Sequence, residues 1–311
     1  MIQLQASDFT ADEWQRAKAL DGALRFEEIT DPASAAFDAA YRFLDAFFGA
    51  KGELEDRDAL AGLMRERWID YGNRCEGTYH LIAAWHGDAL VGVRDCYVDI
   101  DLDAELCLVA LSHSLVAPAW RRSGLAAWFR AVPGALSCQV LQARFGRPWP
   151  TLVGAEMEPV DLGDESSILR LLSYGRAGFR ALDPQRFRYS QPDFRCLPGA
   201  THTGIAMVGV VRPLGLPEDA LPPEVCAIYP RLFHACHRMY LPAALVDPSE
   251  SHALTTLAAS PEPVRLLDLP RAIDDHAAIA PLTRAAVWPL YPPGLRGPAA
   301  AVTGGSAGDA A

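Results

Sequence analysis

The order of the predicted secondary-structure elements indicates an α+β fold, in which a mixed sheet is flanked by helices. Apolar runs of strand length alternate with stretches whose apolar residues recur at helical spacing. Glycine, proline and aspartate residues stand at the joints between these stretches. From residue 24 to residue 212 the predicted order is strand, helix, helix, three strands, helix, strand, helix and strand.

The first strand is predicted at residues 24–29, where apolar and charged side chains alternate. Asp31-Pro32 then opens a helix, because proline suits the first helical turn. A second helix is predicted over residues 57–71. Both helices carry an apolar stripe at helical spacing, which we expect to pack in the core.

Two apolar runs, at residues 80–85 and 89–97, surround the turn His86-Gly87-Asp88 and predict a β-hairpin. A strand at residues 106–116 follows. A short turn then leads into a helix from Ser123 to about Val132.

The next elements are a strand at residues 151–157 and a helix from Asp164 to Ala177. Asp164 and Glu165 suit the first turn of that helix, where negative charge is favoured. Gly178 follows its last turn, where glycine often ends a helix. The last strand of the sheet is predicted at residues 203–211.

The composition divides the chain into four parts. Residues 1–23 are a polar, helical N-terminal extension, and residues 24–212 hold the predicted sheet. Prolines open an accessory region at residues 213–296, which begins with a helical period and is predicted to be largely helical. Residues 297–311 are of low complexity and are predicted to be disordered.

The charge of the chain bears on its partners. The formal net charge is -11 at pH 7, which argues against nucleic acid because phosphate binding needs a basic face. An acidic surface favours a cationic or amine substrate. No apolar stretch reaches about 18 residues, and no signal peptide is visible, so we expect a cytoplasmic protein without a membrane span.

The seven cysteines are odd in number and widely spaced, and no C-x-x-C occurs. We therefore expect reduced thiols rather than a disulfide framework or a zinc ribbon. The cluster His234-Ala235-Cys236-His237 is interpreted as a packed helix end, and no metal site is predicted.

The segment from Leu106 to Arg130 is the most informative part of the chain. Its turn reads Arg121-Arg122-Ser123-Gly124-Leu125-Ala126. A glycine lets backbone N–H groups approach a ligand, and a helix start adds partial positive charge, which together can hold a phosphate group. With arginine, glycine and alanine at its first, fourth and sixth positions, this turn resembles the acyl-CoA pyrophosphate loop of the GCN5-related N-acetyltransferase (GNAT) superfamily. The order of elements over residues 24–212 is also similar to that family's.

The resemblance implies an acyl-CoA N-acyltransferase-like fold with acetyl-CoA as co-substrate. The backbone at Leu115 and Val116 would then pair with the pantetheine arm as an added strand. An N–H there, which we assign to Val116, would polarise the thioester carbonyl. The pyrophosphate would be held by the N–H groups of Arg121, Arg122, Ser123, Gly124, Leu125 and Ala126.

A second part of the resemblance lies in the stretch Tyr174-Gly175-Arg176-Ala177-Gly178-Phe179. In many family members the tyrosine of such a stretch lies beside the CoA sulfur and protonates the departing thiolate. Tyr174 is therefore predicted to be the general acid.

The general base is less well defined, because Ala110 stands where many family members have a glutamate. His113 on the same strand, and Glu156 or Glu158 on the following strand, are candidates. We assign the base to Glu156, and a water chain is the alternative.

These residues predict an N-acetyltransferase that moves an acetyl group to a primary amine of a small molecule or protein, by direct attack in a ternary complex. Two alternatives stay open: transfer of a longer acyl chain from acyl-CoA or an acyl carrier protein, and a module that binds CoA without catalysis. The acceptor is not predictable. Residues 213–296 are expected to cover the sheet, to shape the acceptor site or to make a homodimer contact.

Overall fold

The computed structural model describes residues 4–20, 22–193 and 204–296, and these form a mixed sheet flanked by helices, as predicted. The main path of the sheet follows the order β1-β3-β4-β5-β6-β9-β7-β11-β10, with β2 added to β3 and β8 to β9. Its strands are β1 (Arg25–Ile29), β2 (Ile69–Gly72), β3 (Cys75–His86), β4 (Ala89–Asp101), β5 (Leu106–Val116), β6 (Thr151–Met157), β7 (Arg180–Leu182), β8 (Tyr189–Pro192), β9 (Gly204–Leu214), β10 (Ala220–Leu221) and β11 (Val264–Asp268).

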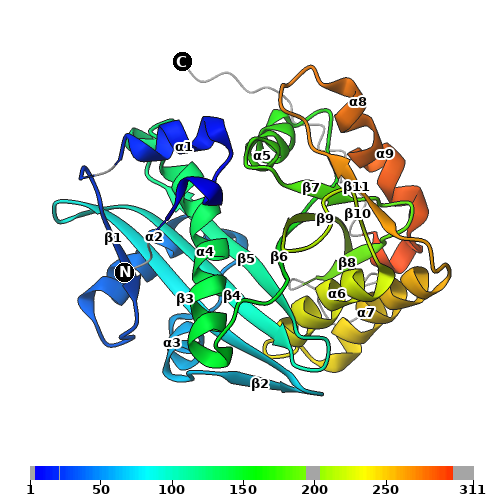
Figure 1. The fold of residues 1–311 in the computed structure, drawn as a ribbon, viewed down its shortest axis with the longest axis horizontal. Coiled ribbons are helices and arrows are strands. Elements are labelled where there is room, and N and C mark those ends of the chain that lie inside the picture. The colour runs from blue at the N-terminus through cyan, green and yellow to red at the C-terminus, as the bar shows by residue number, and fades with distance from the viewer. Residues whose placement is uncertain (1–3, 21, 194–203, 297–311) are drawn as a thin grey trace.

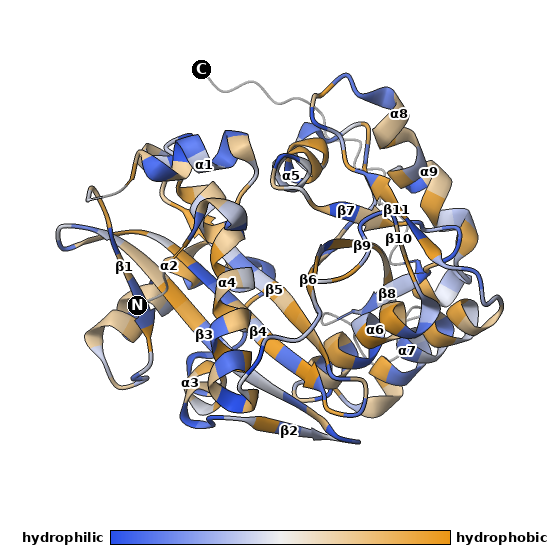
Figure 2. Cartoon of the chain, in the orientation of Figure 1, coloured by the Kyte–Doolittle hydropathy of each residue, from blue (hydrophilic) through white to orange (hydrophobic). Residues whose placement is uncertain are grey.

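Helices cover both faces of this sheet (Figure 1). They are α1 (Ala11–Lys18), α2 (Ala35–Phe48), α3 (Arg57–Arg65), α4 (Leu125–Phe145), α5 (Glu165–Arg176), α6 (Pro223–His237), α7 (Ala243–Ala258), α8 (His276–Ile279) and α9 (Arg284–Val287). Residues of α1, α4 and α5 share one apolar core with the sheet, and residues of α2, α3 and α6 share the other. Figure 2 shows the matching pattern, with hydrophobic colour along the central strands and mixed colour on the helices.

Most predicted elements are present. The hairpin is β3 and β4, and the strand and helix around the turn at residues 121–126 are β5 and α4. Helix α5 begins after Asp164, whose carboxylate accepts a hydrogen bond from the N–H of Ser166. The order from β1 to β9 is the predicted order with three short strands added, β2, β7 and β8.

Three helix boundaries were wrong. Helix α2 begins at Ala35 rather than at Pro32, because the hydroxyl of Ser34 caps its first turn. The second helix ends at Arg65 rather than Tyr71, because Ile69 and Asp70 pair with β3 as strand β2. Helix α4 continues past Pro133 to Phe145, far beyond Val132. Its later turns bury Leu136 and Leu141 in the core, and this packing outweighs the hydrogen bond that proline removes.

The N-terminal extension ties α4 to α5. Thr10 caps α1 and donates a hydrogen bond of 2.9 Å to the carbonyl of Arg176 at the end of α5. Glu13 on α1, with only 5% of its surface exposed, forms an ion pair with Arg130 on α4. Arg130 in turn donates to Ser173 on α5 over 2.8 Å. These contacts fix α1 across the ends of both helices (Figure 1).

The region after residue 213 continues the sheet and covers it. It contains helices, as predicted, and also two strands that the sequence analysis did not predict. Strand β11 pairs with β7, and α6 packs against β4 and β5. The expected covering of the sheet is therefore present, while the role in the acceptor site, the homodimer contact and the domain limits stay predictions. The low-complexity tail, at residues 297–311, lies outside the described residues.

In the part of the chain that the structure describes, none of the helices has the length and apolarity needed to cross a membrane. The six described cysteines are free, and four of them are buried: Cys96, Cys107, Cys226 and Cys236.

Candidate functional site

The sheet splits between β5 and β6. These two strands pair in parallel over a short stretch, in which Cys107–Ala110 lie beside Thr151–Gly154. Beyond it, β5 continues along β4 to Val116, whereas β6 continues along β9 to Met157. The two strands therefore diverge, and a wedge opens in the middle of the sheet.

A β-bulge accompanies the split. Cys96 of β4 lies opposite Leu111 and Arg94 lies opposite Ser114, so two residues of β5 face the single residue Asp95. The carboxylate of Asp95 accepts a hydrogen bond from the backbone N–H of His113 at 2.5 Å and lies 3.0 Å from its Nδ1. Because a bulge bends its strand and increases the local twist, it directs the end of β5 away from β6.

A cleft of about 540 Å³ occupies the wedge. Its floor is formed by residues 110–113 of β5 and 156–158 at the end of β6. The walls come from the α2–α3 connection, from β8 and β9, and from α6 of the C-terminal region. We call this cavity the split-sheet cleft.

Carboxylates dominate the polar lining of the split-sheet cleft. The positively charged groups in it are Arg170, which forms an ion pair of 3.4 Å with Glu158, and His113. An excess of negative charge in a concave site favours a cationic ligand. The acidic residues that line the cleft are Glu53, Glu55, Asp56, Glu156, Glu158 and Asp193.

Glu156, the predicted base, lies in the cleft floor with 13% of its side chain exposed. Burial raises the pKa of this carboxyl to about 7, and a hydrogen bond from the hydroxyl of Tyr189 limits the rise. A general base is most effective when its pKa is near the working pH. Its Oε2 atom lies 3.9 Å from Nε2 of His237.

Glu156 and the alternative base His113 differ in their protonation at neutral pH. Burial lowers the pKa of His113, but the charge of Asp95 and its hydrogen bond raise it to a net value of about 9. His113 therefore carries a proton at neutral pH and cannot accept another. Glu158, the other alternative, also lines the cleft and is paired with Arg170.

Helix α6 closes one side of the cleft with Phe233, Cys236 and His237. The hydroxyl groups of Tyr240, which follows the helix, and Tyr97 on β4 lie 2.9 Å apart. The place of these residues in a cleft was not predicted, and Cys236 and His237 were interpreted only as part of a packed helix end. Nothing in the helical period of residues 225–240 shows which strands the helix will cover.

The divergence of β5 leaves backbone donors facing the wedge. The N–H of Ala117 donates to the carbonyl of Val91 on β4. Since successive N–H groups of a strand point to opposite edges, those of Val116 and Ser114 point away from β4, towards the side that β6 has left. The backbone of Leu115 faces β4 instead, so the expected pairing of its backbone with a ligand is not supported.

The predicted phosphate loop keeps three backbone donors available. The N–H groups of Arg121 and Ser123 bond to carbonyls of the preceding turn, and that of Leu125 bonds to the Ser123 hydroxyl. The N–H groups of Arg122, Gly124 and Ala126 donate no hydrogen bond to any of the described residues. The Ala126 donor belongs to the first turn of α4, where the helix dipole favours an anion.

Gly124 also has a structural role. Its φ of +100° suits glycine, and a Cβ placed there would lie 2.3 Å from the carbonyl oxygen of Arg16 in α1. The N-terminal extension thus packs against one side of the loop, and a glycine at this position would be needed for that contact alone.

Arg94 is a second residue that the sequence analysis missed, although it is a cation within an apolar strand. It is 1% exposed and lies opposite Ser114, two residues from Gly92, which packs beneath Leu125 and Phe129 of α4. Its Nε and Nη2 atoms are buried without a hydrogen-bond partner among the described residues. A buried guanidinium in this state is suited to bind an anion.

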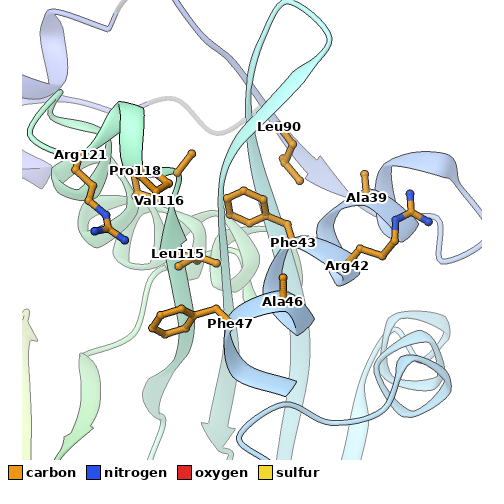
Figure 3. A pocket seen from close by; sticks show the side chains of 11 residues that line it. Ala39, Arg42, Phe43, Ala46, Phe47, Leu90, Leu115, Val116, Pro118 and Arg121 are labelled. Atoms are coloured by element: carbon orange, nitrogen blue, oxygen red, sulfur yellow. The ribbon is translucent and has the colours of Figure 1, made fainter. Parts of the chain in front are cut away.

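A second pocket, of about 510 Å³, lies beside the end of β5 (Figure 3). Leu115, Val116 and Arg121 line it from one side, and Phe43 and Phe47 of α2 line it from the other. The lining is mainly apolar and suits a hydrocarbon group, with the guanidinium groups of Arg42 and Arg121 also in it.

Tyr174 lines neither of these two pockets. It lies in the last turn of α5, and its ring packs edge-on against Phe179 with centroids 4.9 Å apart. Its role as general acid stays a prediction, as do the catalytic role of Glu156 and the binding roles of the loop residues.

The described residues contain no group of three or more His, Cys, Asp or Glu side chains arranged to hold a metal ion. The His234-Ala235-Cys236-His237 cluster lies at the end of α6, where the side chains of His234 and His237 are both buried.

No family model and no curated protein matches the chain. Solved structures do match. A putative GNAT-family acetyltransferase from Desulfovibrio desulfuricans is 18% identical, with 62% of this chain and 98% of that chain covered and a TM-score of 0.35. An acyl-CoA N-acyltransferase from Pseudomonas aeruginosa is 16% identical, with 61% of this chain and 99% of that chain covered and a TM-score of 0.33. An aminoglycoside acetyltransferase from an uncultured soil metagenomic sample is 17% identical, with 49% of this chain and 86% of that chain covered and a TM-score of 0.31.

Proposed function

We propose that the protein is an acyl-CoA-dependent N-acyltransferase that moves an acetyl group from acetyl-CoA to a primary amine of a small molecule or protein. The observation that carries this proposal is the split-sheet cleft. One edge of the split carries a buried carboxyl whose pKa is near 7. The other edge continues past the cleft to Ser114 and Val116, whose N–H groups point away from β4. Such a pairing of base and oxyanion donors is what acyl transfer to an amine requires.

The residues around the start of α4 suit acetyl-CoA as the acyl donor. Acetyl-CoA supplies a thioester and a pyrophosphate, and the latter suits the free N–H groups of Arg122, Gly124 and Ala126 at the start of α4. Arg94 offers a buried positive charge two residues from Gly92, the glycine that packs beneath the start of that helix. The N–H of Val116 faces the wedge, where it would bind the thioester oxygen as negative charge builds there.

The remaining steps belong to side chains. Glu156 takes a proton from the incoming ammonium group, so that the nitrogen can attack the thioester carbon. As the new C–N bond forms and the C–S bond breaks, Tyr174 gives its proton to the departing thiolate. The second proton that the nitrogen loses on becoming an amide then restores the Tyr174 hydroxyl. The excess of carboxylates in the cleft attracts the cationic acceptor and holds it beside Glu156.

The direct test is a turnover assay with the full chain. Acetyl-CoA is incubated with a panel of diamines, lysine peptides and amino sugars, and free thiol and acylated product are measured. We expect thiol release that depends on the amine and yields an N-acetyl product. Tight binding of CoA with no release for any amine would instead favour the non-catalytic CoA-binding module.

Tyr174→Phe tests the general acid. Among the described residues the Tyr174 hydroxyl forms no hydrogen bond, so the variant should keep the stability of the parent. We expect kcat to fall about 10- to 100-fold, because the thiolate would leave without a proton. A leaving group of lower basicity should restore part of the rate. An unchanged kcat would remove Tyr174 from the mechanism.

Arg94→Met tests whether the buried guanidinium serves the donor. Replacing an unpaired buried charge by an apolar side chain should stabilise the unliganded protein by about 1–4 kcal/mol. The same change should weaken CoA binding about tenfold or more, as measured by calorimetry. Loss of stability together with unchanged CoA affinity would show that Arg94 has a structural role only.

A longer acyl chain is the second candidate, and the apolar pocket at the end of β5 favours it. This pocket adjoins Leu115 and Val116, the residues nearest to the predicted pantetheine path. Comparing kcat/KM for acetyl-, octanoyl- and palmitoyl-CoA separates the two candidates. A steady rise with chain length would favour the longer donor.

A further inference from the structure

The strongest feature beyond the proposed reaction is the environment of Glu156. The hydroxyl of Tyr189, on β8, donates a hydrogen bond to Oε1 of this carboxylate. Tyr189 is completely buried, whereas Glu156 is partly open to the cleft, so the bond reaches the carboxylate from the protein interior. It fixes one oxygen of Glu156 and leaves Oε2 to receive a proton.

Tyr189 is held by the C-terminal region. Its ring packs edge-on against Tyr229 of α6, with centroids 5.1 Å apart, and against Phe233 and His234 of the same helix. Nε2 of His234 lies 3.0 Å from the carbonyl of Ser190, the next residue of β8. Tyr291, from the end of the described chain, donates a hydrogen bond of 2.8 Å to the carbonyl of Tyr189.

We propose that Tyr189 is the positioning residue for Glu156, and that α6 and Tyr291 hold Tyr189 in the required place. This inference rests on the proposed function, in which Glu156 is the base. It gives residues 213–296 a role in the reaction itself, because the orientation of the base depends on side chains from that region.

Other groups also face Glu156 and must be separated from Tyr189. Burial is the main reason that the pKa of His237 is lowered well below its ordinary value, so this neighbour is neutral. The hydroxyl of Tyr229 donates to the backbone carbonyl of Ala155 at 2.7 Å rather than to the carboxylate. The titratable or charged groups around Glu156 are Glu158 beside it, Arg170 on α5, Asp193 after β8, Tyr229, Cys236, His237 and Tyr240 on or after α6, and Glu55 and His113 across the cleft.

Tyr189→Phe removes the hydroxyl and keeps the ring. Because the hydrogen bond favours the charged carboxylate, its loss should move the rise of kcat with pH upward by about one pH unit. The rate at pH 7 should fall about fivefold, while KM for the amine changes little, since Tyr189 does not line the cleft. A merely structural role would lower stability without moving the pH midpoint.

Tyr229→Phe is the matched control. It removes a hydroxyl from a ring of the same buried cluster, but one that bonds to a backbone carbonyl. Its pH midpoint should equal that of the parent protein. An equal shift in both variants, or no shift in Tyr189→Phe, would overturn the proposal.

A readout without activity separates this inference from the proposed function. For the parent and for Tyr189→Phe, we compare the free energy of unfolding with that of the same protein carrying Glu156→Gln. The pH dependence of this difference reports the titration of Glu156 directly. An upward shift of this midpoint in Tyr189→Phe, with no acyl transfer by the parent, would sustain the positioning contact and refute the transferase.

Discussion

Replacing Glu156 with glutamine is expected to lower the rate of acyl transfer at least about 100-fold, because a positioned base contributes factors of about 10² to 10⁴. Glutamine can still accept the hydrogen bond from Tyr189, so the cleft should keep its shape. The affinity for CoA should be unchanged, since Glu156 lies on β6 and the predicted phosphate loop follows β5. Steady-state kinetics and calorimetry measure both quantities.

The same variant should be more stable than the parent at high pH. Burial raises the pKa of Glu156 from 4.5 to about 7, so the native state binds its proton more tightly than the unfolded state. The favourable contribution of this group is complete below pH 4.5 and is lost as pH rises through 7. At pH 8 the difference amounts to about 3 kcal/mol in the free energy of unfolding. At pH 4.5 it should vanish.

Glu158→Gln is the control for this comparison. Glu158 follows the same strand, but its side chain is 46% exposed and its pair with Arg170 is a surface contact. The free energy of unfolding of Glu158→Gln should differ little from that of the parent protein at every pH. A Glu156→Gln protein that is less stable at pH 8, or that keeps its activity, would contradict the assignment of a buried catalytic carboxyl.

Replacing Gly124 with alanine is expected to destabilise the protein and to weaken CoA binding together. The new Cβ would lie 2.3 Å from the Arg16 carbonyl, and the φ of +100° is unfavourable for alanine. Either α1 or the loop must move, at a cost of about 2–4 kcal/mol. Because such a movement disturbs the N–H groups of Arg122, Gly124 and Ala126, the rise in melting temperature on adding CoA should shrink.

Gly146→Ala provides the matched control at the other end of α4. Gly146 also has a left-handed φ, +74°, but nothing lies within 4 Å of a Cβ placed there. This variant should lose only about 1 kcal/mol, the cost of the backbone conformation. Equal losses at both sites would show that α1 does not pack against the loop. An unchanged CoA effect in Gly124→Ala would remove the loop from the donor site.

Local signals were enough to predict the main elements. The turn His86-Gly87-Asp88 defined the hairpin, and Asp164 and Gly178 marked the ends of α5, because turn and cap chemistry depends on neighbouring residues. Boundaries decided by packing were missed. Helix α4 runs through Pro133 because its later turns are buried, and Ile69 left the predicted helix because β3 offered it an edge.

The candidate site was predictable only in part. Glu156 was found because it lies on the strand after the loop, and the loop because its six residues adjoin one another in the chain. Arg94 and Tyr189 were missed, since their significance depends on which groups lie opposite them across the sheet.

The sequence by itself determined the kind of fold, the position of the loop and the two carboxylates beside the opening, because these follow from periodicity and from residues close together in the chain. Tertiary structure alone decided that β5 and β6 diverge, that α1 packs against Gly124, and that α6 lines the cleft. Contacts of this kind join residues far apart in the chain, and their free energies depend on burial and shape, which no short stretch of sequence encodes.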